Sequence, residues 1–95
     1  MATSHDIAAR RIAKIHGCKY RPGRSPDVKC SRIRVEVKST ASEISKAQRQ
    51  LAGGHGRAYI ALPKPEHPEA LRRLKGRKTG LMDYLGNVKK PSTRK

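Results

Sequence analysis

Apolar residues recur with two different spacings along this chain of 95 residues. Through residues 4–16 the spacing is helical, because Ala8, Ile12 and Ile15 fall on one face of an α-helix. Ser4 is placed to cap that helix at its start. The segment is therefore predicted to be an amphipathic helix that packs through these side chains.

Two further segments are predicted to be helical. Residues 42–52 carry an apolar stripe, and Ser42 is a possible cap. The glycine-rich segment 53–57 ends this helix, either as a simple C-cap or as a loop that cradles a phosphate with its amides. Residues 67–76 follow a proline-rich stretch and form the third predicted helix.

The remaining apolar residues follow the spacing of β-strands. The run at 57–63 is nearly continuous and ends at a proline, which is typical of a strand buried on both faces. Apolar and charged residues alternate through 32–39, which also indicates a strand. The other predicted elements are a short strand with a turn, a strand, and a hairpin that turns at Gly86-Asn87, over residues 18–26, 27–31 and 79–90.

This order of elements predicts an α/β fold, in which helices flank a mixed β-sheet. Residues 1–90 are expected to form one domain, and residues 91–95 a disordered basic tail. The chain has no Phe and no Trp, so its core is built from aliphatic side chains and is thin. A homodimer would bury more surface and help to stabilise it.

The charge of the chain narrows the class of partner. Its 23 Lys and Arg against 7 Asp and Glu give a net charge of +16, which attracts polyanions such as nucleic acid. No apolar run reaches the length of a membrane span, no secretory segment is present, and no long basic amphipathic helix favours a membrane surface. The expected location is the cytoplasm or nucleoid of a prokaryote or of a virus-infected host.

Cysteine and histidine give no sign of a metal site by their spacing alone. Cys18 and Cys30 lack the close pairing of a metal knuckle. They could face each other across a hairpin, but buried free thiols are the expectation in a reducing compartment. The four histidines are scattered and are expected to lie on the surface.

Two of the few acids lie close together in the predicted sheet. Glu36 and Lys38 point to the same face of their strand, opposite to the neighbouring valines. If the preceding strand folds back through a tight turn, Val28 lies opposite Val35, and Asp27 then lies opposite Glu36. The pattern therefore predicts two carboxylates and a lysine on one face.

Such a pair of carboxylates needs an explanation. With about 5 Å between them, the two charges repel by about 3 kcal/mol at an effective dielectric of about 20. A divalent cation removes this repulsion, and Mg²⁺ is typically held by one or two carboxylates together with phosphate oxygens. Lys38 could orient a water or stabilise charge on a phosphate. The alternative is an exposed strand whose charged residues only face solvent.

Pro26-Asp27 followed by Glu36-Val37-Lys38 resembles the PD-(D/E)xK motif of the restriction-endonuclease-like nuclease superfamily. From about residue 5 to residue 63, the order of elements is similar to that of the archaeal-type Holliday junction resolvases. The resemblance implies a restriction-endonuclease-like αβββαβ core and a DNA endonuclease that depends on Mg²⁺, with Mn²⁺ as a substitute.

The same resemblance implies roles for individual residues. Asp27 and Glu36 would bind the metal with the carbonyl of Val37, and Lys38 would be the catalytic lysine. Asp6 lies where the family's helix bears an acid; alternatively, it only stabilises the first helical turn. The candidates for contacts with DNA are Arg21, Arg24, Ser25 and Gln48, with Gln50 as the alternative to Gln48.

The expected substrate is branched DNA, cut during recombination or repair. One site cuts one strand, so a resolvase needs a homodimer. The chain is too short for a separate sequence-reading domain, which favours recognition by shape and phosphate contacts. The alternatives are a less selective nuclease for flaps, nicks or single strands, and a basic nucleic-acid-binding protein of ribosomal or chromatin type without catalysis.

Overall fold

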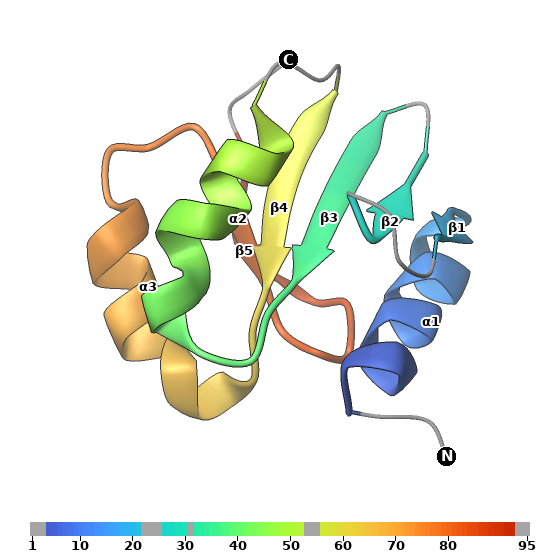
Figure 1. Ribbon diagram of the computed structural model, residues 1–95, viewed down its shortest axis with the longest axis horizontal. Coiled ribbons are helices and arrows are strands. Elements are labelled where there is room, and N and C mark those ends of the chain that lie inside the picture. The colour runs from blue at the N-terminus through green and yellow to red at the C-terminus, as the bar shows by residue number, and fades with distance from the viewer. Residues whose placement is uncertain (1–3, 22–25, 31, 53–55, 93–95) are drawn as a thin grey trace.

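The computed structural model describes residues 4–21, 26–30, 32–52 and 56–92. These residues form three α-helices and a six-stranded sheet, so the predicted α/β class with a mixed sheet is confirmed (Figure 1). In chain order, the elements are α1 (Ser4–His16), β1 (Lys19–Tyr20), β2 (Val28–Lys29), β3 (Ile33–Val37), the 3₁₀ turn η1 (Ala41–Glu43), α2 (Ile44–Leu51), β4 (Arg57–Ala61), the 3₁₀ turn η2 (Lys64–Glu66), α3 (His67–Leu74), β5 (Gly80–Met82) and β6 (Val88–Lys90).

The strands lie in the sheet in the same order as in the chain. β4 runs parallel to both β3 and β5, whereas the outer pairs, β1–β2, β2–β3 and β5–β6, are antiparallel. Val28 pairs with Val35, which confirms the predicted hairpin register. The observed ladder ends at Val28, and one further step in the same register would bring Asp27 opposite Glu36.

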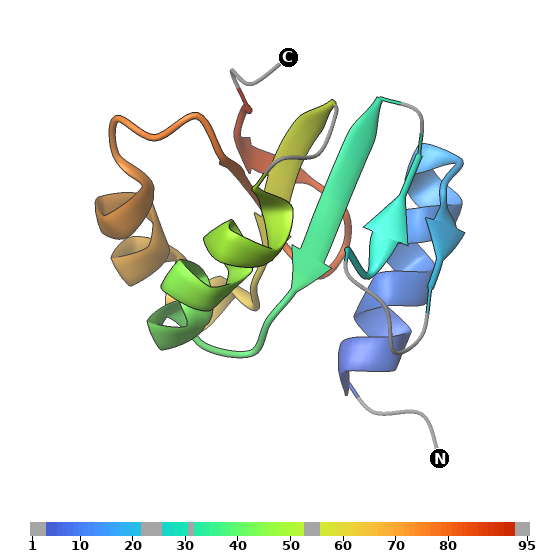
Figure 2. The same cartoon turned by 45° about the horizontal axis from the view of Figure 1, so that its top comes forward.

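Helices cover both faces of the sheet (Figure 2). On one face, α1 packs against a core that includes Val35, Val37 and Tyr59. On the other face, α2 and α3 pack against a second core that includes Ala58 and Ile60. The central strands β3 and β4 are therefore buried on both sides, as the sequence predicted for residues 57–63.

Ala8 and Ile12 of α1 are buried, as predicted, but the rest of the buried face differs from the prediction. Its buried residues include Ala9 and Ala13, whereas Ile15, which was expected in the core, is 56% exposed. Small alanine side chains allow the helix axis to approach the sheet closely. The helix is thus rotated toward its alanine side, away from Ile15.

The start of the second helix also differs from the prediction. Ser42 lies inside η1 and is not the cap. The carboxylate of Glu66, from η2, instead accepts a hydrogen bond of 2.8 Å from the main-chain N–H of Ala41. A carboxylate satisfies an otherwise unpaired amide at the start of a helical segment.

A buried arginine joins β3 to the end of α2. Arg34 is buried on the α2 side of the sheet, and its guanidinium donates hydrogen bonds to the carbonyls of Leu51 and Gly56. Leu51 is the last residue of α2, where main-chain carbonyls lack helical partners and a positive charge is favourable.

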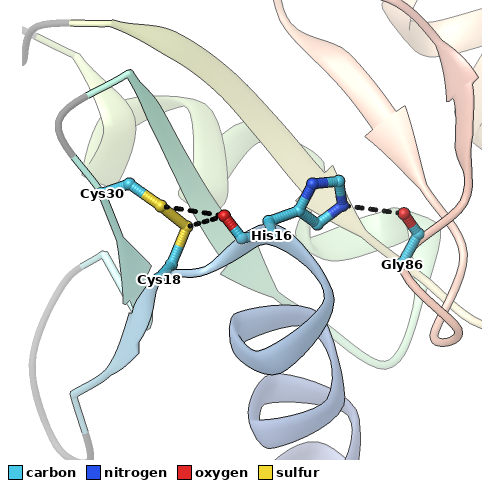
Figure 3. The surroundings of a disulfide bond; sticks show 4 residues. All are labelled: His16, Cys18, Cys30 and Gly86. Atoms are coloured by element: carbon cyan, nitrogen blue, oxygen red, sulfur yellow. Dashed lines mark hydrogen bonds between the residues drawn. A yellow bond between two sulfur atoms is a disulfide. The ribbon is translucent and has the colours of Figure 1, made fainter.

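The expectation of free thiols is wrong, because Cys18 and Cys30 form a disulfide (Figure 3). Cys18 precedes β1 and Cys30 follows β2, so the antiparallel pairing of these strands brings their Cα atoms to 4.7 Å. Both sulfur atoms also lie close to the carbonyl oxygen of His16, at 3.6 and 3.7 Å. The bond therefore closes the β1–β2 hairpin where it meets the end of α1.

All four histidines were expected to lie on the surface, and this expectation is wrong for two of them. His67 is buried, and its Nε2 lies 2.7 Å from the carbonyl oxygen of Leu62. His16 is half-buried, and its Nε2 lies 2.9 Å from the carbonyl oxygen of Gly86. Figure 3 marks this contact with a dashed line. These rings satisfy main-chain carbonyls, a contact that a single sequence does not reveal.

Near the C-terminus, one residue of the predicted disordered tail is packed against the domain. Ser92 is buried; its hydroxyl accepts a hydrogen bond from the N–H of Ala58 and donates one to the carbonyl of Lys78. Residues 93–95 lie outside the described residues. None of the described helices is long and apolar enough to cross a membrane.

Candidate active site

Glu36 and Lys38 lie together at the carboxyl end of β3. Glu36 is only 1% exposed, because it sits on a central strand beside Ile60 of β4. The ammonium of Lys38 lies 3.9 Å from a carboxylate oxygen of Glu36. A buried carboxylate is costly unless it is paired. The alternative interpretation, in which these charges only face solvent, therefore does not describe Glu36.

Asp27 is fastened to the same end of β3. Its Oδ2 accepts a hydrogen bond of 2.9 Å from the main-chain N–H of Val37, and its own carbonyl accepts one of 2.7 Å from the N–H of Arg21. Asp27 is buried. The hairpin and the strand thus hold this carboxylate next to the Glu36-Val37-Lys38 segment, as the motif predicted.

A third contributor comes from the first turn of α1. Nε2 of His5 lies 3.2 Å from Oδ2 of Asp27. Sequence reasoning missed this residue, because its position depends on how α1 packs on the sheet. His5 was expected to lie on the surface, and its side chain is 41% exposed, but its ring also contacts Asp27.

Asp6, the predicted helix acid, points elsewhere. Its carboxylate accepts a hydrogen bond from the hydroxyl of Tyr20 on β1. This hydrogen bond, together with burial, raises the pKa of Tyr20 above its usual value of 10.0. Asp6 also lies 4.0 Å from Nδ1 of His5. The imidazole of His5 therefore lies between the carboxylates of Asp6 and Asp27.

A hollow of about 340 Å³ opens beside these residues. His5, Val37 and Lys38 line one part of it. The other lining residues are Ser4, Ser39, Glu43 and Tyr84. The hollow therefore lies beside Lys38 and beside the histidine that contacts Asp27, whereas Asp27 and Glu36 are not among its lining residues.

Glu43 adds a negative charge to this hollow. Burial raises its pKa, but hydrogen bonds from the hydroxyls of Ser39 and Thr40, with the charge of Lys38, outweigh burial and lower the pKa below 4.5. Glu43 is therefore ionised at neutral pH. Sequence reasoning missed it, although the Thr40-x-x-Glu43 spacing is the pattern of a helix N-terminus.

Tyr84 joins the C-terminal hairpin to the site. Its hydroxyl donates a hydrogen bond of 2.5 Å to the carbonyl of Lys38. Burial, and then the charge of Glu43, raise the pKa of Tyr84 above 10.0, so the hydroxyl keeps its proton. From the sequence alone, no role could be assigned to this hairpin.

The predicted DNA contacts are placed only in part. Arg21 is half-buried beside Asp27, and Gln48 is half-buried on α2. Within the described residues, the buried amide oxygen of Gln50 has no hydrogen-bond partner. Arg24, Ser25 and the glycine-rich residues 53–55 lie outside the described residues.

The donors suit a hydrated divalent cation. Among the residues that the structure describes, no three His, Cys, Asp or Glu side chains form a group that could hold a metal. Mg²⁺, however, keeps several waters and is commonly held by one or two carboxylates with substrate phosphates. Asp27, which is hydrogen-bonded to the end of β3 and contacts the imidazole of His5, fits that kind of partial shell.

No family model matches the chain, and neither a curated protein nor a solved structure matches it. The function is therefore inferred from the residues and their geometry.

Proposed function

We propose that the protein is a metal-dependent DNA endonuclease with a restriction-endonuclease-like core. The observation that carries this proposal is the buried carboxylate of Glu36 paired with the ammonium of Lys38 at the end of β3, next to the Asp27 carboxylate that the Val37 N–H holds in place. A charged cluster of this kind is costly for a fold of this size, which supports a catalytic role.

Each residue has a distinct task in this proposal. Asp27 and Glu36, with the carbonyl of Val37, would hold Mg²⁺ or Mn²⁺. A bound divalent ion supplies charge neutralisation at a phosphate and lowers the pKa of a bound water. Lys38 borders the hollow beside Glu36, so its ammonium is placed to stabilise negative charge that develops on a scissile phosphate.

The substrate that we favour is branched DNA, cut by a homodimer. The net charge of +16 supports binding to phosphates without sequence reading. Two copies would supply the two cuts that resolution of a junction needs. A less selective nuclease for flaps, nicks or single strands uses the same residues, and substrate comparison separates the two.

The test is cleavage of a labelled four-way junction beside linear duplex and flap DNA, each with Mg²⁺ and with EDTA. Lys38→Ala should abolish cleavage while DNA binding persists. Lys46→Ala is the matched control, because it removes the same charge from an exposed position on α2. Paired nicks near the branch that need Mg²⁺ and Lys38 would support the resolvase.

The second candidate is a basic nucleic-acid-binding protein without catalysis, which the charge alone favours. It gives no task to the buried acids. Tight binding without cleavage in Mg²⁺ and Mn²⁺ alike would support this candidate and contradict the endonuclease.

A further inference from the structure

The contact between His5 and Asp27 has the spacing of two neighbouring metal ligands. Ligand atoms about 2.1 Å from an octahedral metal lie about 3 Å apart along each edge of the octahedron. Nε2 of His5 and Oδ2 of Asp27 are 3.2 Å apart. One cation could therefore bind both atoms with little movement of either side chain.

The imidazole is also accessible, and a carboxylate lies near its second nitrogen. Its ring lines the hollow beside Lys38, where a hydrated ion and a phosphate can enter. Its other nitrogen, Nδ1, lies 4.0 Å from the carboxylate of Asp6, and the hydroxyl of Tyr20 holds that carboxylate. At 4.0 Å this contact is longer than a hydrogen bond, so the carboxylate acts on the ring through its charge. A small movement would close it to the hydrogen bond that commonly supports a metal-binding histidine.

We propose that His5 is a metal ligand together with Asp27, and that the site therefore prefers first-row transition ions to Mg²⁺. This inference rests on the proposed metal-dependent function. A nitrogen ligand suits transition ions, whereas Mg²⁺ selects an all-oxygen shell. Asp6 then acts as a positioning residue that orients His5 and does not bind the ion.

Binding of Mn²⁺ and Mg²⁺ to the full chain without DNA tests this inference. Isothermal titration calorimetry gives the two affinities, and electron spin-echo modulation of bound Mn²⁺ detects a coordinated imidazole nitrogen. The informative variants are His5→Gln, which removes the nitrogen, and His5→Glu, which replaces it by a carboxylate. His16→Gln is the matched control, because His16 lies on the same helix but contacts the carbonyl of Gly86.

The wild-type protein and His16→Gln should both show imidazole nitrogen bound to Mn²⁺, and His5→Gln should lose this signal. We expect His5→Gln to weaken Mn²⁺ binding at least about tenfold, a loss typical of changes around a bound metal, and to weaken Mg²⁺ binding much less. His5→Glu should reduce the preference for Mn²⁺ over Mg²⁺. Circular dichroism of each variant checks that the fold is retained.

An unchanged nitrogen signal or unchanged Mn²⁺ affinity in His5→Gln would overturn the inference, and His5 would then only hydrogen-bond to Asp27. Metal-dependent cleavage by the same variant would leave the endonuclease standing. If the wild-type protein binds neither ion and cuts no DNA, both proposals fail together. The two failures are thus distinguishable.

Discussion

The hydroxyl of Tyr84 donates a hydrogen bond to the carbonyl of Lys38, 46 positions earlier in the chain. Lys38 comes directly after β3, where the chain leaves the sheet toward η1. Its N–H donates to the carbonyl of Ala61 on β4, so both main-chain groups of Lys38 are tied to other segments. The hairpin of β5 and β6 therefore takes part in holding the proposed catalytic lysine.

Tyr84→Phe should lower the rate of DNA cleavage while leaving the protein folded. The variant loses one neutral hydrogen bond, which costs about 1 kcal/mol of stability, but it frees the carbonyl that fixes Lys38. We expect about a tenfold loss in kcat, because small displacements of a catalytic group are costly. Tyr59→Phe, which makes the same chemical change in the core, should keep the wild-type rate.

The pattern of apolar residues predicted most of the fold, because its spacing follows the local geometry of helices and strands. Alternation through β3 and the continuous apolar run of β4 located the central strands, and the Val28–Val35 register followed from matching the faces of two strands. The same hairpin indicated that Cys18 and Cys30 could face each other. Free thiols were nevertheless expected, because a reducing compartment was assumed, and that expectation was wrong.

The candidate site was predictable only where it lies on the strands. One hairpin fixes the positions of Asp27, Glu36 and Lys38. Their spacing in the sequence is therefore enough to predict that they lie close together. His5 and Tyr84 reach the site through packing of distant segments, 22 and 46 positions from their partners. That packing depends on the whole core, which a short motif does not describe.

Asp27→Asn should separate the chemical role of this residue from its structural one. The amide oxygen can still accept the hydrogen bond from Val37, so the fold should persist. Loss of the negative charge should abolish metal-dependent cleavage, and DNA binding should stay equal or become tighter. A filter-binding assay beside the cleavage assay checks both; retained cleavage would remove Asp27 from the proposed catalytic group.

Arg34→Met should destabilise the protein by about 2–4 kcal/mol. The variant keeps much of the packing but leaves the carbonyl of Leu51 at the end of α2 without its charged donor. For a domain of this size, each kcal/mol lowers Tm by about 4–8 °C. Thermal unfolding followed by circular dichroism measures the change. Arg49→Met is the control, because Arg49 is exposed near the end of the same helix; an equal Tm loss would contradict this explanation.

Asp83 should make the protein more sensitive to acid. Burial raises its pKa, but hydrogen bonds from Asn87 and Leu85, with the charge of Lys89, outweigh burial and lower the pKa below 3.8. A carboxyl group with a lower pKa in the folded state stabilises the protein above its unfolded pKa, and this stability is lost as the pH falls through the folded pKa.

The comparison with Asp83→Asn isolates this contribution. The variant should be less stable than the wild-type protein at pH 7, and the difference should shrink as the pH falls below about 4. Urea unfolding at several pH values measures both curves. Parallel curves for the two proteins across this range would contradict the assignment to Asp83.

Reduction of the Cys18–Cys30 disulfide should destabilise the β1–β2 hairpin and, with it, the placement of Asp27. The bond closes a short loop, with a separation of 12 positions, and a loop of this length contributes about 3 kcal/mol in the chain-entropy model. Reduced thiols gain S–H groups that can donate to the nearby carbonyl of His16, which offsets a small part of the loss.

Dithiothreitol should therefore lower both Tm and the cleavage rate of the wild-type protein. The double variant Cys18→Ser, Cys30→Ser should resemble the reduced protein and not respond to the reductant. If dithiothreitol lowered the Tm of both proteins equally, the effect would not arise from this bond.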